Sequence, residues 1–260
     1  MTSHDLQSVA LTLVASGKGI LAADETIPTL TRRFDALGIQ STEHSRRAYR
    51  EMLLTSRGAE EFISGVIIQD EPFVKRVPMA RHLLRCSRTR ASFPASRSTG
   101  AKPLAGSPAR VSANAHALAR YAALCQEQHL VPIVEPEVLM DGPHTIERCE
   151  EVTGTVLHAV FHALVEQGVA LEAMLLKPNM VIPGKECSRQ ASLAEVATAT
   201  LRCLRRHVPV AVPGIVFLSG GQNALLATAH LNAVNRLPDS KPWKVSFSYG
   251  RALQDPALEA

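Results

Sequence analysis

The chain has 260 residues, of which 46% are apolar, so it is long enough to bury a sizeable core as one large domain. It contains no run of 18 apolar residues, and Met1 leads into a helical pattern rather than a signal peptide. We therefore expect neither membrane insertion nor export, and a cytoplasmic location. The five cysteines are scattered and odd in number, which fits reduced thiols better than a disulfide framework or a zinc site.

The formal net charge of +4 comes from one segment of the chain. Between Glu71 and Glu127 there are ten basic residues and no carboxylate, whereas the rest of the chain holds 18 basic and 24 acidic residues. One interpretation is a basic protein that binds nucleic acid through residues 75–110. That segment has a single aromatic residue, Phe93, and no recognisable nucleic-acid-binding module, so we expect no nucleic-acid partner.

Apolar runs bounded by turns alternate with helical patterns in the first part of the chain. A helix is predicted over residues 4–16, and the short strand that follows it ends on a carboxylate, Asp24. Two further helices, over 29–37 and 45–56, lead to a second strand at 61–70. This alternation is typical of a parallel sheet covered by helices.

Residues 76–99 interrupt the alternation. The segment is rich in arginine and serine and has weak periodicity after Leu84, which predicts a poorly ordered, solvated connection. The aberrant basic connection extends to about residue 112, where a helical pattern over 111–128 takes over.

The second part of the chain contains four strands that each end on a chemically reactive group. The predicted strands are 130–137, 171–179, 212–219 and 244–250, and helices are predicted between them at 144–168, 192–207 and 223–237. The groups at the strand ends are Glu135 and Glu137, then Lys177, then Ser219-Gly220-Gly221, then Arg251. In a closed parallel barrel the carboxyl ends of the strands meet on one face, so these groups would converge there.

Lys177 is the candidate nucleophile. An amine held at the rim of a buried strand is partly desolvated, which favours its neutral form and lets it attack a carbonyl to form a Schiff base. Pro178 ends the strand and directs the chain away from the core. The alternative is a strand that simply leaves the core into solvent at a Lys-Pro pair.

Two acids could assist such a lysine. Glu135 could donate and accept the proton that is moved when a carbinolamine loses water, although Glu-Pro-Glu also fits a turn with solvated carboxylates. Asp24 could take a proton from a substrate hydroxyl or simply cap a helix.

Anion binding is the other chemistry that the strand ends suggest. Ser219-Gly220-Gly221 could present a hydroxyl and backbone N–H groups to an anion, helped by the following helix N-terminus. Arg251 could clamp a phosphate with two donors. A plain tight turn and a solvated arginine are the respective alternatives.

Five motifs, taken in chain order, resemble those of class I fructose-bisphosphate aldolase. They are GILAADE at 19–25, VPIVEPE at 131–137, LEAMLLKPN at 171–179, FLSGGQ at 217–222 and SFSYGRAL at 246–253. The resemblance covers residues 4–75 and 100–260 and implies a (β/α)8 TIM barrel, usually a cytosolic homotetramer of glycolysis and gluconeogenesis. It further implies reversible cleavage of fructose 1,6-bisphosphate to dihydroxyacetone phosphate and glyceraldehyde 3-phosphate, with no metal and no cofactor.

The resemblance also implies a role for each matching catalytic residue. Lys177 matches the Schiff-base lysine and Glu135 the proton-transfer glutamate. Glu137 matches an acid that supports the lysines of the site, and Asp24 the acid that handles the substrate hydroxyl during carbon–carbon cleavage. The sugar phosphate is the expected partner.

Phosphate binding is implied at both ends of the substrate. Ser219, Gly220 and Arg251 match the site for one phosphate, with Gly221 in the same turn. Arg33 contributes to the site for the other phosphate.

The chain departs from the family pattern in its middle. The family's third strand carries a Lys-x-Asp whose places are held here by Ser96 and Ser98. A family-like Gly-Ile-Lys-Val-Asp-Thr read one nucleotide out of phase gives the Ala-Ser-Arg-Ser-Thr of 95–99. We infer that residues 76–99 arose from a frame-shifted stretch, and sequencing the gene across codons 76–113 tests this.

Between Gly106 and Ala113 the chain also skips about forty residues of the family pattern. They include the fourth strand and its Lys-Trp-Arg, whose lysine is the family's partner for proton transfer, and the family's C-terminal helix and tail are absent beyond Ala260. A parallel barrel without two adjacent strands exposes two edges or closes with strain, so we expect six barrel strands of eight, low stability and aggregation.

Two functional hypotheses follow for this single domain over residues 1–260. One is a fructose-bisphosphate aldolase, with catalysis weakened or lost through the missing strands. The other is a non-catalytic aldolase remnant that binds sugar phosphates or partner subunits.

Overall fold

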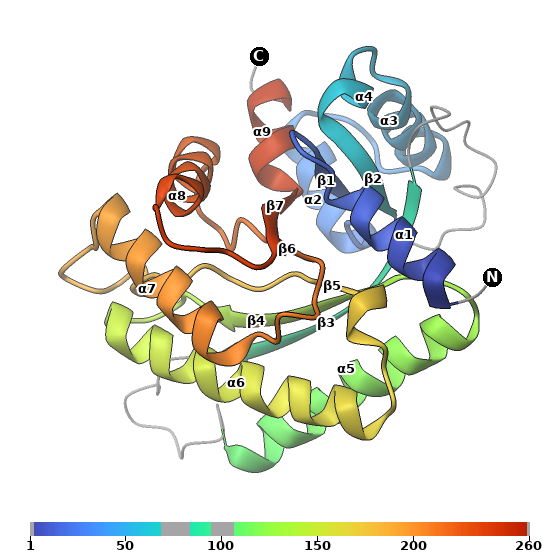
Figure 1. Cartoon of the computed structure of the whole chain (residues 1–260). Helices are drawn as coiled ribbons and strands as arrows, with labels where there is room; N and C mark the ends of the chain where they lie inside the picture. Colours follow the sequence, from blue (N-terminus) through green and yellow to red (C-terminus); the bar gives the residue numbers. More distant parts are fainter. Residues whose placement is uncertain (1–2, 69–83, 95–106, 259–260) are drawn as a thin grey trace.

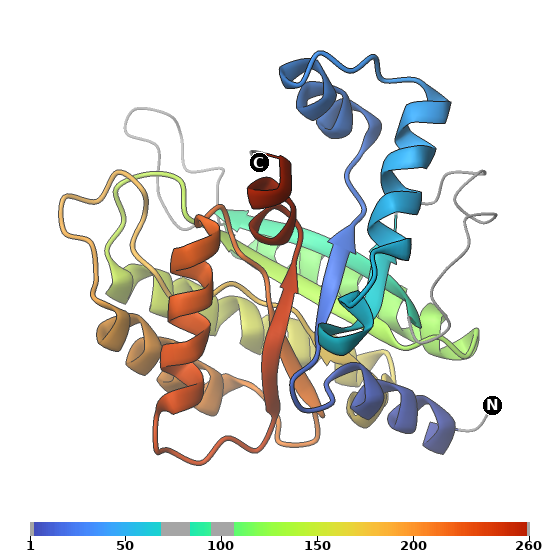
Figure 2. The ribbon, with the colours of Figure 1, turned by 90° about the horizontal axis from the view of Figure 1, so that it is seen from above.

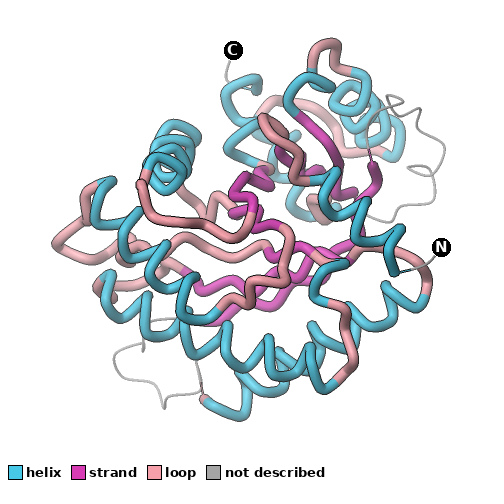
Figure 3. Tube along the Cα trace, in the orientation of Figure 1, coloured by secondary structure: helices cyan, strands magenta, loops and turns pink. Residues whose placement is uncertain are grey.

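The chain folds as a closed parallel barrel with helices on the outside. A computed structural model describes residues 3–68, 84–94 and 107–258 (Figure 1). The strands follow one another around the barrel in chain order, β1 to β7, and the last one pairs with the first. Figure 3 shows the strands in the interior and the helices around them, and Figure 2 gives the view from above.

The strands are β1 (Gly19–Ala23), β2 (Ile63–Ile68), β3 (Leu84–Pro94), β4 (Pro132–Leu139), β5 (Leu175–Leu176), β6 (Gly214–Phe217) and β7 (Lys244–Tyr249). The α-helices are α1 (Ser3–Leu13), α2 (Ile27–Ala36), α3 (Glu43–Thr55), α4 (Ala59–Phe62), α5 (Pro108–Glu127), α6 (Ile146–Glu166), α7 (Leu193–His207), α8 (Ala224–Arg236) and α9 (Arg251–Leu258), with a 3-10 turn, η2, at Leu171–Ala173. The expected fold, an incomplete α/β barrel of the (β/α)8 type, is confirmed, because the described residues contribute seven parallel strands rather than eight.

The basic segment contributes a strand, and here the expectation of a poorly ordered connection is wrong. Leu84–Pro94 forms β3, which pairs with β2 through Gly65↔Leu84 and with β4 from Ser87↔Pro132 onward. A strand pairs through backbone N–H and C=O groups, which every non-proline residue supplies whatever its side chain. Residues 76–83 and 95–106 of the expected connection lie outside the described residues.

The presence of β3 decides between the two alternatives given for a barrel without two strands, which were exposed edges or closure with strain. β3 occupies the place between β2 and β4 and the barrel closes, so the alternative with exposed edges is wrong. Closure satisfies the backbone groups that an open edge would leave to solvent or to another chain.

The predicted strand at 171–179 is shorter than expected. Leu171–Ala173 forms η2, and β5 consists of Leu175 and Leu176 alone. β5 contacts β6 through a single residue pair, Leu176↔Ile215. Pro178 has no N–H to donate, which explains why the pairing stops there.

Apolar packing closes one end of the barrel and covers its outside. Leu6 and Leu13 of α1 pack with Ile20, Ile133 and Val216, so α1 closes the amino-terminal end of the barrel. A larger cluster joins α5, α6 and α7 to β4, β5 and β6. These two clusters hold the strands whose carboxyl ends carry the candidate site residues.

Helix starts follow the capping residues in the sequence. Ser192 and Glu195 form a capping box at the start of α7, with the Ser192 side chain accepting from the Glu195 N–H and Glu195 accepting from the Ser192 N–H. Asn223 caps α8 by accepting from the Leu226 N–H at 2.8 Å. No helix in the described part of the chain is long and apolar enough to cross a membrane.

Candidate active site

A cavity of about 280 Å³ lies at the carboxyl ends of the strands. Its lining comes from residues in or after β1, β4, β5, β6 and β7 and from α2, which is the convergence expected at this face of a parallel barrel. Glu135 and Glu137 lie within β4, which runs on to Leu139, beyond the predicted end of the strand. The lining residues are Ala22, Asp24, Glu25, Thr26, Thr29, Arg33, Glu135, Glu137, Lys177, Leu218, Ser219, Gly220, Ser248, Gly250 and Arg251.

Lys177 and Glu135 form a buried ion pair at this cavity. Lys177 Nζ lies 3.1 Å from Glu135 Oε1, and the two side chains are 4% and 3% exposed. With so little water nearby, the two charged groups depend on each other and on fixed protein dipoles for stabilisation. The pair is thus arranged for proton exchange between an amine and a carboxylate.

Two more acids lie at the same cavity. Glu137 is two residues beyond Glu135 on β4, so both side chains leave the same face of the strand, and Glu137 is 6% exposed. Asp24 follows β1 and is partly exposed at the cavity. The structure therefore brings Lys177, Glu135, Glu137 and Asp24 together.

The backbone around Lys177 is fixed by its neighbours. The Lys177 N–H donates to Val134 O at 2.8 Å, which keeps the lysine in register with β4 beyond the end of β5. Asn179, which is 3% exposed, accepts from the Val138 N–H at 2.9 Å and donates to Thr153 Oγ1 at 3.2 Å. These bonds tie the Lys-Pro-Asn segment to β4 and α6 and so define where the amine lies.

The turn between β6 and α8 presents Ser219 and Gly220 to the cavity. Gly220 and Gly221 have φ angles of +60° and +77°, in the left-handed region that favours glycine. The Gln222 side chain and backbone both donate to Ser219 O, which closes the turn. Gly221, predicted together with Gly220, is not among the residues that line the cavity.

Arg251 is placed by the start of α9, a helix that the sequence analysis did not predict. It lines the cavity from an exposed position, next to Gly250. Gly250 packs against β1 so closely that an added Cβ would lie 3.0 Å from Ala22 O. Glycine at this position therefore lets the chain turn from β7 into α9 beside the cavity.

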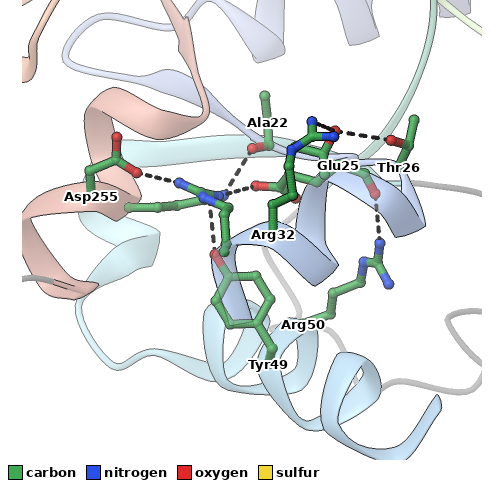
Figure 4. Close-up of polar contacts among 10 residues, drawn as sticks. Ala22, Glu25, Thr26, Arg32, Tyr49, Arg50 and Asp255 are labelled. Atoms are coloured by element: carbon green, nitrogen blue, oxygen red, sulfur yellow. Dashed lines mark hydrogen bonds and ion pairs between the residues drawn. The ribbon is translucent and has the colours of Figure 1, made fainter. Parts of the chain in front are cut away.

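Arg33 also lines the cavity, but its guanidinium is already engaged. Nη1 donates to Glu25 Oε1 at 2.7 Å and to Gln254 Oε1, and Nη2 forms an ion pair with Asp255. Figure 4 shows Glu25, from the loop between β1 and α2, gathered here with Tyr49 of α3 and Asp255 of α9. In Figure 1, α9, which carries Gln254 and Asp255, stands beside α2.

A neutral phenol completes the Arg33 cluster. Burial, reinforced by the Glu25 carboxylate, raises the pKa of Tyr49 to about 12. Tyr49 therefore stays protonated and donates its O–H to Gln254 Oε1 at 3.0 Å, while Gln254 Nε2 donates to Ala22 O at 3.1 Å. These bonds fix α9 against β1 and α3.

Four polar side chains of the lining were not predicted from the sequence. Glu25, Thr26 and Thr29 follow the predicted Asp24, and Ser248 precedes Gly250 by two residues. Ser248 is 1% exposed, and its Oγ has no hydrogen-bond partner among the described residues. The signal for Ser248 was the alternation along β7, which turns it toward the inside of the barrel.

A metal centre has no candidate in the part of the chain that the structure describes, because no group of three or more His, Cys, Asp or Glu side chains is placed to hold an ion there. The chemistry available at the cavity is that of an amine, carboxylates, hydroxyls and arginines.

Comparisons with known proteins agree on one family. The sequence model described as "Glycolytic: Fructose-bisphosphate aldolase class-I" matches residues 5–107 and 101–260. The chain is 44% identical to a probable fructose-bisphosphate aldolase class 1 of Xanthomonas campestris, covering all of this chain and 90% of that protein. It is 39% identical to "Fructose-bisphosphate aldolase 4, cytosolic" of Arabidopsis thaliana, covering 99% of this chain and 76% of that protein.

A solved structure of fructose-bisphosphate aldolase from Plasmodium falciparum, in complex with TRAP and a small-molecule inhibitor, is also similar. Its TM-score to this chain is 0.90 at 38% identity, over 99% of this chain and 86% of that one. The similarity thus extends from the sequence to the whole barrel.

The comparisons also bear on the expected deletion. The alignment with the Xanthomonas protein runs over 305 positions, so at least 45 of them have no counterpart among the 260 residues of this chain. The two family matches meet at residues 101–107, close to the predicted gap after Gly106, although the first match includes residues 76–99, which the resemblance had left out. Matched along nearly its whole length in sequence and in fold, the chain belongs to the class I fructose-bisphosphate aldolases, a family of glycolytic enzymes.

Proposed function

We propose that this chain carries out the reversible aldol cleavage of fructose 1,6-bisphosphate through a Schiff base on Lys177. The observation that supports the proposal most is the buried contact of 3.1 Å between Lys177 Nζ and Glu135 Oε1 at the cavity. An ammonium beside a carboxylate can transfer its proton to that neighbour and attack a carbonyl carbon as the free amine.

The first half of the reaction builds the imine. The Lys177 nitrogen bonds to the ketose carbonyl carbon, and the carbonyl oxygen becomes the hydroxyl of a carbinolamine. Glu135 returns a proton to that hydroxyl, water leaves, and an iminium ion remains. Glu137 supports the positive charge of the lysine during these steps.

The second half breaks the carbon–carbon bond. Asp24 takes the proton of the hydroxyl on the carbon that becomes the aldehyde, and the electrons of the broken bond move into the iminium to give an enamine. Glyceraldehyde 3-phosphate leaves, the enamine takes up a proton on carbon, and water hydrolyses the resulting iminium. Dihydroxyacetone phosphate is released and the Lys177 amine is restored.

The phosphates are assigned to the two ends of the cavity. Ser219, the Gly220 N–H and Arg251 bind one phosphate, with Gly221 setting the turn that presents them. Arg33 contributes to the site for the other phosphate.

Borohydride trapping tests the proposal. The chain is incubated with dihydroxyacetone phosphate and sodium borohydride, and the modified residue is located by mass spectrometry. An adduct on Lys177 that is absent from Lys177→Met, with fructose 1,6-bisphosphate cleaved in a coupled assay, is the expected result. A chain that gives no adduct would overturn the Schiff-base proposal.

A second candidate is the non-catalytic remnant that binds sugar phosphates or partner subunits. At least 45 positions of the Xanthomonas relative have no counterpart here, which favours a loss of activity. Phosphate binding measured by calorimetry, without any cleavage of fructose 1,6-bisphosphate, would select this candidate over the enzyme.

We also propose a cytoplasmic location and a homotetramer for this chain. The first is supported by the Arabidopsis relative that is named cytosolic, and the second only by the resemblance to the family. Cell fractionation and light scattering at defined concentration check them.

A further inference from the structure

The end of the cavity assigned to the second phosphate already contains two carboxylates bound to its arginine. Arg33 is 14% exposed on its side chain, Glu25 is 10% exposed, and Nη1 lies 2.7 Å from Glu25 Oε1. Asp255 engages Nη2 of the same guanidinium. A phosphate that uses Arg33 bidentately must therefore displace Asp255 or lie beside it as a second negative group.

Asp255 is held in this position by its helix. Arg251 and Asp255 are four residues apart, so they share one face of α9, with Arg251 at the cavity and Asp255 one turn further on. Gln254, between them, accepts from Tyr49 and donates to Ala22 O, which fixes the helix against the barrel. The Asp255 carboxylate thus has a defined place next to Arg33.

Three carboxylates lie at or beside this end, because Asp24 and Glu25 line it and Asp255 adjoins it. Arg33 lines the cavity but is bound to Glu25 and Asp255. Two further arginines, Arg32 and Arg50, donate to Thr29 and to the Glu25 carbonyl but do not line the cavity. Neutral groups are also present, since the hydroxyls of Thr26 and Thr29 line the cavity and lie 3.0 Å from each other. Hydroxyls of this kind can both donate to and accept from the hydroxyls of an unphosphorylated sugar end, which needs no arginine.

We propose that Asp255 is a specificity-determining residue, which competes with a substrate phosphate for Arg33 and makes the site favour ketose phosphates that carry a phosphate at one end only. The inference rests on the proposed Schiff-base function, because the two substrate classes are compared at Lys177. A bisphosphate is still accepted, but its second phosphate must first replace the Asp255 carboxylate.

The test compares fructose 1-phosphate with fructose 1,6-bisphosphate in three proteins. The concentration that gives half-maximal borohydride trapping on Lys177 is measured for the wild type, for Asp255→Asn and for Asp239→Asn. Asp239 is a matched control, because it pairs with Arg205 at 3.2 Å outside the cavity and both its side chain and that of Asp255 are about half exposed.

Asp255→Asn should lower the half-maximal concentration of the bisphosphate on the order of fivefold, as expected for one partly exposed ion pair. The value for fructose 1-phosphate should stay within a factor of about two, and Asp239→Asn should change neither. The gain should shrink as salt is added, because screening weakens the competition between carboxylate and phosphate. An equal effect of Asp255→Asn on both sugars, or no effect on either, would overturn the inference.

Calorimetry separates this inference from the proposed function. Binding of both sugars to Lys177→Met, with and without Asp255→Asn, needs no imine. If Asp255→Asn raises the affinity of Lys177→Met for the bisphosphate alone, the role of Asp255 is supported. This holds even if the wild type gives no trapped adduct and the Schiff-base proposal fails. Equal affinities in this pair overturn the role of Asp255 even if trapping succeeds.

Discussion

At the scale of single residues, the buried Lys177–Glu135 pair explains why two charged side chains occur in an otherwise apolar interior. Side chains that are 4% and 3% exposed lose most of their hydration, and a buried pair of this kind is often no more stable than an apolar replacement. Stability alone therefore does not account for the pair, whereas the proposed proton exchange between its members would.

Replacing Glu135 by Gln should slow the reaction of Lys177 without unfolding the chain. The amide keeps the size of the carboxylate but cannot accept the proton of the amine, so trapping on Lys177 should slow about a hundredfold or more. The measurement is the rate of adduct formation with dihydroxyacetone phosphate, with circular dichroism as the check on folding. Glu151→Gln, at a side chain that is 68% exposed, is the control. An unchanged trapping rate would remove Glu135 from the mechanism.

At the scale of secondary-structure elements, the junctions between strands and helices carry the site. Ser219 and Gly220 connect β6 to α8, and Arg251 connects β7 to α9. Glycine is required at the first of these junctions by a positive φ and by close neighbours. A Cβ on Gly220 would lie 3.0 Å from Leu218 Cδ1 and from Met140 Cε.

Gly220→Ala should therefore lower the free energy of unfolding more than an alanine substitution at another glycine with a similar φ angle. Gly168, after α6, has φ +68° and nothing within 4 Å of an added Cβ, so Gly168→Ala isolates the backbone strain. We expect Gly168→Ala to lower the free energy of unfolding by about 1 kcal/mol and Gly220→Ala by about 2–3 kcal/mol. Urea denaturation measures both. Equal costs would mean that the neighbours of Gly220 yield without penalty.

Site residues at the ends of apolar strands could be predicted from the sequence, whereas features that depend on distant partners could not. Lys177, Glu135 and Ser219 were found because each ends an apolar run, and parallel strands bring such ends together. β3 was missed because its residues lack the apolar alternation of a strand, and its pairing depends on β2 and β4, which are distant in sequence. Asp255 was missed for the same reason, since its partner Arg33 lies more than 200 residues away.

At the scale of the whole molecule, the barrel closes with seven strands in the described part of the chain. The expectation of low stability rested on exposed edges or on strained closure, and β3 removes the first of these causes. Low stability and aggregation stay predictions for thermal unfolding and light scattering. The frame-shift hypothesis likewise stays a prediction for the gene sequence.

The stability of the whole fold should fall as the medium becomes acidic. Burial lowers the pKa of His144 and of His230 below the usual histidine value of about 6.5. The unfolded chain therefore binds protons at these positions before the folded chain does, so their contribution is complete above about pH 6.5 and is lost as the pH falls below it.

Urea denaturation between about pH 7.5 and about pH 5.5 should show this loss as a falling midpoint. His230→Asn should flatten the dependence, because it removes a side chain that is 4% exposed. His44→Asn, at an exposed position, should leave it unchanged. A midpoint that is independent of pH over this range would contradict the assignment.

The shortest strand pairing among the described strands lies next to Lys177. Leu176 and Ile215 form the single residue pair in register between β5 and β6, and Lys177 is the next residue along the chain. Because so few residues pair there, we expect the barrel to open locally at this pairing most often. Amide protons there should exchange with deuterium faster than those between β3 and β4. Each such opening would displace the strand end that holds Lys177 3.1 Å from Glu135, so we expect exchange at this pairing to report how often that contact is lost.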